Sequence, residues 1–140
     1  MAERLTLLAV FYNEEKRLPG LFKNVEGLFD DIVVVDCGSS DRTAEICSKN
    51  GARVFGSKIR YFENNVNFAF SKVKDKSWIL ILDGDERISP EMKQEMRQAI
   101  ADPNVDVYFI KRPKYVFDGF TTVGRINSFY PRLFRKGAVR

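Results

Sequence analysis

Strand-like and helix-like segments alternate along the first 110 residues of this 140-residue chain, and this order constrains the fold more than any other feature. The strand-like segments are short apolar runs, at residues 5–12, 31–36, 52–55, 78–82 and 105–110. Apolar residues recur at helical spacing between them, at residues 18–29, 39–51, 62–73 and 89–100. The alternation predicts a three-layer α/β/α sandwich, with a mostly parallel sheet and helices on both faces.

Residues 111–140 differ from the rest of the chain because they are basic and aromatic and show no clear period. They carry a net charge of +7, against −3 for residues 1–110, which together make the +4 of the whole chain. We expect irregular structure here, with one more strand at "SFYPRLF", residues 128–134. A basic segment suits an anionic partner such as a phosphate, a nucleic acid or a membrane surface, although a solvated surface is an equally good explanation.

The residue types that the chain lacks exclude several kinds of catalytic chemistry. There is no histidine, so histidine-based nucleophile systems and His-ligated zinc are excluded. The two cysteines, Cys37 and Cys47, form neither a disulfide framework nor a zinc spacing, and we expect two small, partly buried side chains. No apolar run is long enough to span a membrane and no signal peptide is recognisable, so we expect a cytoplasmic protein.

Three of the predicted strands end in polar, mostly acidic residues. These residues are Tyr12-Asn13-Glu14 after the first strand, Asp36 after the second, and Asp83-Gly84-Asp85-Glu86 after the fourth. In a sheet of this kind the ligand lies outside the carboxyl ends of the strands, where the winding reverses. We therefore expect these side chains to gather at one edge of the sheet and to form the functional site.

The pair Asp83 and Asp85 predicts a divalent cation. Two carboxylates about 5 Å apart repel each other by ~3 kcal/mol at an effective dielectric constant of about 20, and a proton or a cation must offset that repulsion. Mg²⁺ and Mn²⁺ prefer oxygen ligands and share them between carboxylates and phosphates. We expect Gly84 to allow a tight turn and to leave room for a ligand. The alternative is an ordinary turn after the strand.

The other polar residues of this edge allow structural interpretations as well. Asp36 fits a turn or a cap as well as a ligand contact. Asp41 lies where the first turn of a helix favours an acid, and we interpret it as structural. For Asn13, a turn side chain that bonds its own backbone and a ligand contact are equally good interpretations.

Five segments together resemble the GT-A domain of glycosyltransferase family 2, which has a Rossmann-like fold. They are "FYNEEKRLPGLFKNV", "DIVVVDCGSSDRTAEIC", "NGARV", "NFAF" and "WILILDGDERISPE". The resemblance covers about residues 5–101, with a weaker similarity in "YPRLFRKG". It is strongest to the bacterial branch that adds sugars to lipopolysaccharide core or similar glycans.

The resemblance implies an inverting sugar transfer from a nucleotide-diphospho-sugar, with UDP as the default nucleotide and Mn²⁺ or Mg²⁺ as cofactor. It also implies residue roles. Nucleotide-binding roles fall on Tyr12, Asn13, Glu14, Asp36, Asn67 and Asp83, where Asp36 contacts the base or ribose and Asp83 the ribose and sugar. Asp85, with Asp83, holds the metal. Val66 stands where the family often has an arginine, which leaves one contact to the donor diphosphate without its usual residue.

The same resemblance places the catalytic base on the acceptor side, beyond Arg140. We therefore expect residues 1–140 to form a single donor-binding domain whose acceptor half is missing. The acceptor would be a glycan or a lipid-linked sugar, and the basic segment 111–140 would contact the inner face of the membrane.

Three alternatives stay open from the residues themselves. A nucleotide-sugar-binding fragment without catalysis shares the same fold and site. A haloacid-dehalogenase-type phosphatase uses a similar strand-end acid pair, but that pair normally opens the chain. A nucleic-acid-binding module would use the cations and aromatic rings of "YFIKRPKYVF", although we expect those rings to cover the core.

Overall fold

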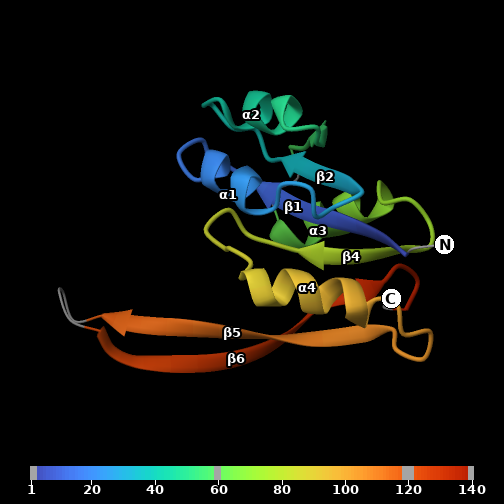
Figure 1. The fold of residues 1–140 in the computed structure, drawn as a ribbon. Coiled ribbons are helices and arrows are strands. Elements are labelled where there is room, and N and C mark those ends of the chain that lie inside the picture. Colours follow the sequence, from blue (N-terminus) through green and yellow to red (C-terminus); the bar gives the residue numbers. More distant parts are fainter. Residues whose placement is uncertain (1–2, 59–60, 118–121, 139–140) are drawn as a thin grey trace.

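The structure of the chain, a computed structural model, describes residues 3–58, 61–117 and 122–138, with segment 111–131 described by its backbone alone. These ranges contain six strands and four helices (Figure 1). The strands are β1 (Arg4–Phe11), β2 (Asp31–Asp36), β3 (Arg53–Gly56), β4 (Ser77–Ile81), β5 (Val107–Phe117) and β6 (Thr122–Arg135). The helices are α1 (Leu18–Asn24), α2 (Thr43–Lys49), α3 (Phe62–Ser71) and α4 (Pro90–Ala99).

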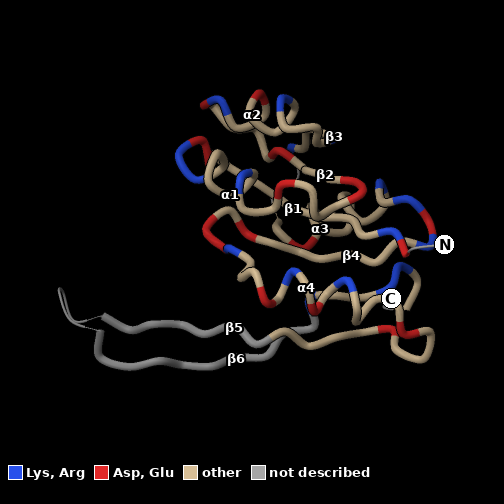
Figure 2. Tube along the Cα trace, in the orientation of Figure 1, with Lys and Arg blue, Asp and Glu red and all other residues tan. Residues whose placement is uncertain are grey.

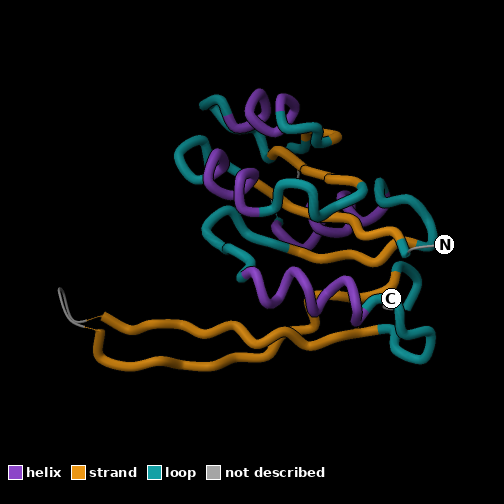
Figure 3. The backbone as a smooth tube through the Cα atoms, viewed as in Figure 1, coloured by secondary structure: helices purple, strands orange, loops and turns teal. Residues whose placement is uncertain are grey.

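The strands form one mixed sheet in the order β3-β2-β1-β4-β6-β5 (Figure 3). The first four run parallel, and Leu8 of β1 pairs with Val33 of β2 on one side and with Ile81 of β4 on the other. β6 then pairs antiparallel with both β4 and β5. The α/β fold with a parallel sheet core, predicted from the sequence, is therefore confirmed.

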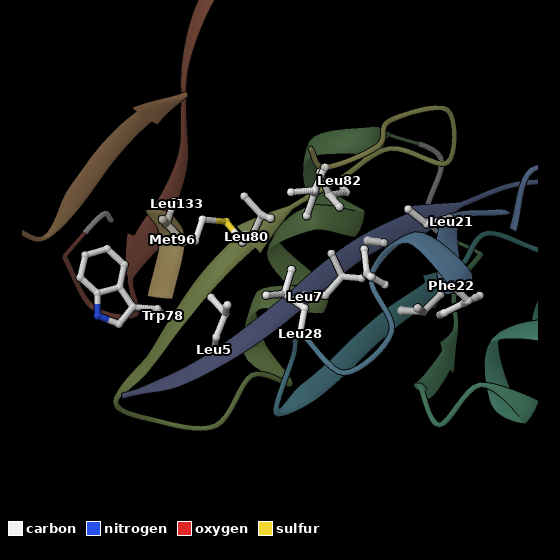
Figure 4. Packing of buried hydrophobic residues seen from close by; sticks show 14 of the residues in the cluster. Leu5, Leu7, Leu21, Phe22, Leu28, Trp78, Leu80, Leu82, Met96 and Leu133 are labelled. Atoms are coloured by element: carbon white, nitrogen blue, oxygen red, sulfur yellow. The ribbon is translucent and has the colours of Figure 1, made fainter. Parts of the chain in front are cut away.

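Helices cover both faces of the parallel strands, which gives the three predicted layers. Buried residues of α1, α2 and α4 pack against one face, together with inward-facing strand residues such as Leu5 and Leu7 (Figure 4). α3 packs on the opposite face, where Ala69 joins a second cluster with Leu8 and Val33. The alternation of Leu7 and Leu8 between the two clusters shows that β1 is buried on both faces, as expected for a central parallel strand.

The winding of the sheet reverses beside β1. The chain passes from β1 to β2 and β3 in one direction, and α3 then carries it back to β4 on the other side of β1. The carboxyl ends of β1, β2 and β4 all lie at the same edge of the sheet, on the left in Figure 1, where the strands are drawn as arrows. This edge is the switch point at which α/β sheets bind their ligands.

All four helices are shorter than the sequence predicts, and α1 and α2 differ most from the predicted ranges. α1 ends at Asn24, because the chain turns at Gly27, whose φ of 75° is easily adopted only by glycine. α2 begins at Thr43, and the residues before it form a loop that belongs to the site described below. None of the helices in the described ranges combines the length and the apolar character that crossing a membrane requires.

The expectation of irregular structure after residue 110 is wrong. β5 and β6 are long and pair antiparallel from Val107↔Phe134 to Phe117↔Thr122, as a ribbon that extends well beyond the body of the sheet (Figure 1). The pairing shifts register beside Phe109, which pairs with Pro131. Proline and glycine in these segments hide the strand signal, but both are tolerated at edges and irregularities of a ribbon.

The ion pair between Asp31 of β2 and Arg53 of β3 makes part of the stability dependent on pH. Arg53 Nε donates to Asp31 Oδ1 at 3.1 Å, and Arg53 Nη2 donates to Asp31 Oδ2 at 2.6 Å. Burial raises the pKa of Asp31, but the hydrogen bonds and charge of Arg53 outweigh burial and leave that pKa below its ordinary value. The pair therefore stabilises the fold at neutral pH, and its contribution is lost as the pH falls through the lowered pKa.

We expect Asp31→Asn to lower the free energy of unfolding by about 1–2 kcal/mol at neutral pH, a modest cost because Arg53 is partly solvated. The difference from wild type shrinks below the ordinary aspartate pKa of about 3.9 and vanishes once Asp31 is protonated in the folded state too. Urea denaturation at neutral pH and in steps down to about pH 3 measures it. A difference that stays constant over this range would contradict the assignment.

Candidate functional site

Residues 83–86 form a tight turn directly after β4, here called the acid turn. The amide of Glu86 donates to the carbonyl of Asp83 at 3.1 Å. In return the amide of Asp83 donates to Glu86 Oε1 at 2.8 Å. The two bonds close the turn from both ends, and they hold Gly84 and Asp85 at its tip.

Gly84 allows a close approach of a neighbouring side chain, which differs from the role expected for it. Its φ is not positive, so the turn itself does not need glycine. A Cβ at this position would lie 2.8 Å from Glu14 Oε2, which is closer than real contacts allow. The space beside Gly84 is therefore filled by the carboxylate of Glu14, which follows β1. This contact brings the acids of the first and fourth strands together, as the sequence predicts.

Three carboxylates of the acid turn could share a cation. Asp83, Asp85 and Glu86 each offer one oxygen, and these oxygens all lie within 4.8 Å of one another. Asp83 is 43% exposed and Asp85 is exposed, whereas Glu86 is only 15% exposed. An all-oxygen donor set without sulfur or imidazole fits a hard divalent cation such as Mg²⁺ or Mn²⁺. Figure 2 shows that acidic positions follow both β1 and β4 at this edge.

Two arginines that the sequence analysis did not identify hold the acid turn in place. Arg87 Nη1 donates to the carbonyl of Gly84 at 2.7 Å, and its Nη2 donates to the carbonyl of Arg17 at 2.9 Å, in the loop after β1. Arg132 of β6 donates to the carbonyl of Ile81 and to Glu86 Oε1, both at 2.9 Å. For Arg132 the only sequence signal was its place in the weakly similar "YPRLFRKG".

The loop after β1 is bonded to the loop after β2. Asn13 has a positive φ of 50°, and its Oδ1 accepts from the amide of Ser40 at 2.9 Å. The amide of Asn13 donates to Ser39 Oγ at 2.9 Å, and Ser39 in turn donates to Asp36 Oδ1. Asn13 therefore bonds the backbone of the neighbouring loop, not its own. Asn13 and Asp36 are thereby brought into one network at the site.

Asp41 has the structural role that its position suggests. Its carboxylate accepts hydrogen bonds from the amide and hydroxyl of Thr43 at the start of α2, and from the amide of Glu15. The hydrogen bonds from Thr43 hold the pKa of Asp41 below its usual range. Thr43 Oγ1 also accepts from the amide of Glu14 at 2.9 Å, so the start of α2 supports the loop after β1.

A cavity of about 510 Å³ lies beside these loops, at the carboxyl ends of β1 and β2. Its lining residues are Val10, Phe11, Tyr12, Cys37, Lys58, Phe62 and Asn65. The rings of Tyr12 and Phe62 are both more than half exposed. Burial raises the pKa of Cys37, and the charge of Asp36 raises it further, so this thiol is neutral at physiological pH. The cavity therefore combines exposed rings with one uncharged and one cationic group.

The structure places Asn65, which the sequence analysis did not single out, in the wall of this cavity. Asn65 is 3% exposed, its Oδ1 accepts from Ser57 Oγ at 2.6 Å, and its Nδ2 donates to the carbonyl of Tyr61 at 3.2 Å. The predicted residue Asn67 lies two positions further along α3, exposed and outside the cavity lining. Its role in nucleotide binding stays a prediction. Nothing in the spacing of the segment distinguishes Asn65 from Asn67.

The fold and this site define an α/β protein of the GT-A class, and solved structures show the same fold. TarS of Staphylococcus aureus superposes with a TM-score of 0.63 at 22% identity, over 74% of this chain and 34% of TarS. Mannosyl-3-phosphoglycerate synthase of Rubrobacter xylanophilus does so with a TM-score of 0.62 at 20% identity, over 74% of this chain and 38% of the synthase.

Residues 6–140 match the glycosyl transferase family 2 model, and the chain belongs to that family. Among sequence relatives, a Rickettsia conorii protein named as an uncharacterized glycosyltransferase is 28% identical over 134 residues. That match covers 96% of this chain and 45% of the relative. The chain thus spans less than half of the length of the Rickettsia proteins it matches.

Proposed function

We propose that this chain binds the nucleotide-diphospho-sugar donor of a glycosyltransferase, together with Mg²⁺ or Mn²⁺. One observation carries the proposal: the acid turn and the cavity of about 510 Å³ both lie at carboxyl ends of neighbouring parallel strands, at the switch point of the sheet. Tyr12 lines the cavity, and Glu14, two residues further on, contacts Gly84 of the acid turn. A ligand with a flat ring at one end and phosphates at the other suits this arrangement.

The residues of the cavity would hold the nucleoside. The exposed rings of Tyr12 and Phe62 are placed to stack on a base. Asp36, whose carboxylate is oriented by Ser39, would contact the base or the ribose. Lys58 is the cation of the cavity lining and would balance the charge of the donor. Uridine is the default base from the family resemblance.

The acid turn would hold the cation and the diphosphate. Asp83 and Asp85 provide the carboxylate oxygens, and Asp83 also faces the ribose and sugar. When bound, the cation stabilises the negative charge that grows on the departing diphosphate. The Glu86 carboxylate accepts from the amide of Asp83, and Arg87 donates to the carbonyl of Gly84. These bonds fix the backbone of the turn before any ligand arrives, so little ordering remains for the binding step.

We propose that the catalytic base for the sugar transfer is not among these 140 residues. In an inverting transfer, a carboxylate takes the proton from the attacking acceptor hydroxyl. We place that base in the part of the family's longer proteins that this chain does not cover. The acceptor would be a glycan or lipid-linked sugar of the cell envelope, with the basic segment 111–140 facing an anionic membrane surface. The chain is then the donor-binding domain of a longer enzyme.

The experiment that tests donor binding is calorimetric titration of the chain with UDP and with GDP. Each nucleotide is titrated in the presence of Mn²⁺, Mg²⁺ or EDTA. We expect one nucleotide to bind more tightly than the other, and EDTA to weaken that binding at least about tenfold because a shared cation is removed. Failure of both nucleotides to bind under any condition would reject the donor site.

A further inference from the structure

Arg132 reaches the acid turn from a different part of the chain. β6 pairs antiparallel with β4, and Leu80 pairs with Leu133, so residue 132 lies beside the end of β4. There Arg132 Nη1 donates to the carbonyl of Ile81 at 2.9 Å. The guanidinium is 17% exposed and is thus built into the sheet edge directly under the acid turn.

The guanidinium engages Glu86 more closely than it engages Asp83. Nη1 of Arg132 lies 2.9 Å from Glu86 Oε1, whereas its Nη2 lies 3.9 Å from Asp83 Oδ2. The same oxygen of Glu86 accepts from the amide of Asp83 at 2.8 Å. One carboxylate oxygen of Glu86 therefore receives two hydrogen bonds, one of them from a cation.

From this geometry we propose that Arg132 is a positioning residue which withholds the Glu86 carboxylate from the cation. The cation is then held by Asp83 and Asp85, and Glu86 shapes the turn without binding the metal. The inference deepens the proposed function and rests on it for the identity of the cation site. Burial agrees with this assignment, because the carboxylates of Asp83 and Asp85 are accessible whereas that of Glu86 is largely enclosed.

The arrangement has a consequence for the diphosphate. Arg132 and Glu86 form a neutral pair, so they add no net charge to the edge that an anionic donor must approach. A third carboxylate on the cation would occupy a position that a phosphate oxygen could use, and it would add negative charge beside the phosphates. The pair thus favours a cation that still has positions free for the donor.

The variant Arg132→Met tests the proposal on the full chain. Titration with Mn²⁺ alone, followed by electron paramagnetic resonance of the free ion, measures cation affinity. We expect the variant to bind Mn²⁺ about tenfold more tightly, because a positive charge is removed and the Glu86 carboxylate is released. We expect UDP in saturating Mn²⁺ to bind about tenfold more weakly, because the edge becomes more negative. Damage to the fold would instead weaken the binding of Mn²⁺ as well as the binding of UDP.

Two further variants serve as controls. The double variant Arg132→Met with Glu86→Gln removes the neutral pair as a whole, so its Mn²⁺ affinity should return to within about threefold of wild type. Arg135→Met removes a partly buried guanidinium from the same strand, where it pairs with Glu3 and Asp106 away from the turn. Its Mn²⁺ affinity should equal that of wild type. An Mn²⁺ affinity of Arg132→Met that is unchanged or lower overturns the proposal.

A second readout applies even if Arg132→Met does not fold. Water-proton relaxation counts the water ligands on bound Mn²⁺, and Glu86→Gln keeps an oxygen that can accept from the amide of Asp83. The count should be the same in Glu86→Gln and in wild type. One additional water in the variant would show that Glu86 is a ligand and would overturn the proposal.

The results for Mn²⁺ and for UDP test the role of Arg132 and the proposed donor site independently of each other. If wild type binds neither UDP nor GDP but the Mn²⁺ results follow the expected pattern, the donor site is rejected and the role of Arg132 stands. If UDP binds with Mn²⁺ but Arg132→Met does not tighten Mn²⁺ binding, the donor site stands and the role of Arg132 is rejected. A wild type that binds no Mn²⁺, with or without UDP, rejects both.

Discussion

Asp85→Asn is expected to lower the affinity for UDP in the presence of Mn²⁺ by about a hundredfold or more, because it removes a carboxylate that binds the cation directly. Asp85 lies at the tip of the acid turn, exposed, with no hydrogen-bond or ion-pair partner of its side chain among the described residues. The turn is closed by Glu86 and Arg87 instead. The substitution should therefore leave the fold intact while it removes the cation.

Calorimetry measures this loss, and thermal unfolding of the same samples checks the fold. The variant in Mn²⁺ should bind UDP no better than wild type does in EDTA. Asp75→Asn is the matched control, because it removes an exposed carboxylate that pairs with Lys136 at the opposite edge of the sheet. Wild-type affinity in Asp85→Asn would show that the acid turn does not hold the cation.

Trp78→Ala is expected to lower the free energy of unfolding by about 3–5 kcal/mol, the usual cost of truncating a buried aromatic residue to alanine. Trp78 of β4 is fully buried against α4 and β6 (Figure 4). Its ring lies 5.6 Å from that of Tyr108, and the guanidinium of Arg135 lies 4.7 Å above it. The substitution removes these contacts together and leaves a cavity between the sheet and α4.

Urea denaturation followed by far-UV circular dichroism measures this cost, since the variant has no tryptophan to report by fluorescence. Trp78→Phe should cost much less, because it keeps an aromatic ring and removes an indole nitrogen that has no hydrogen-bond partner among the residues that the structure describes. Under conditions where Trp78→Ala is folded, its UDP affinity should stay within about threefold of wild type, since Trp78 lies at the far end of β4 from the acid turn. A stability loss below about 1 kcal/mol would contradict the packing described.

The sequence predicts the acidic edge well because each signal there is local. Apolar runs mark the strands, and the polar residues that follow them, such as Asp36 and Asp83, must lie where parallel strands end. The same rule predicts that Glu14 and Gly84 lie close together. It does not predict that the Glu14 carboxylate occupies the space beside Gly84. Which of Asn65 and Asn67 lines the cavity could not be predicted, because that depends on how α3 is rotated against the sheet.

The contact between Arg132 and Glu86 and the full length of the ribbon could not be predicted, because both depend on long-range pairing. The sequence marks residues 105–110 and 128–134 as strands, but no period marks residues 111–127 between them, and β5 and β6 pair with each other along most of their length. The insertion of β6 next to β4 decides that Arg132 meets Glu86, and nothing near either residue encodes that pairing. Tertiary packing decides whether an antiparallel strand joins a parallel sheet, and local β-propensity does not predict that packing.

The pairing of β4 with β6 also fixes the order in which a newly made chain completes its site. Glu86 and Arg132 are 46 residues apart, and translation adds about 5–20 residues per second. The acid turn therefore leaves the peptidyl-transferase centre ~2–9 seconds before Arg132, which pairs with Glu86. During that interval the nascent chain carries Glu86 without Arg132, and the final form of the turn appears only when β6 has joined the sheet.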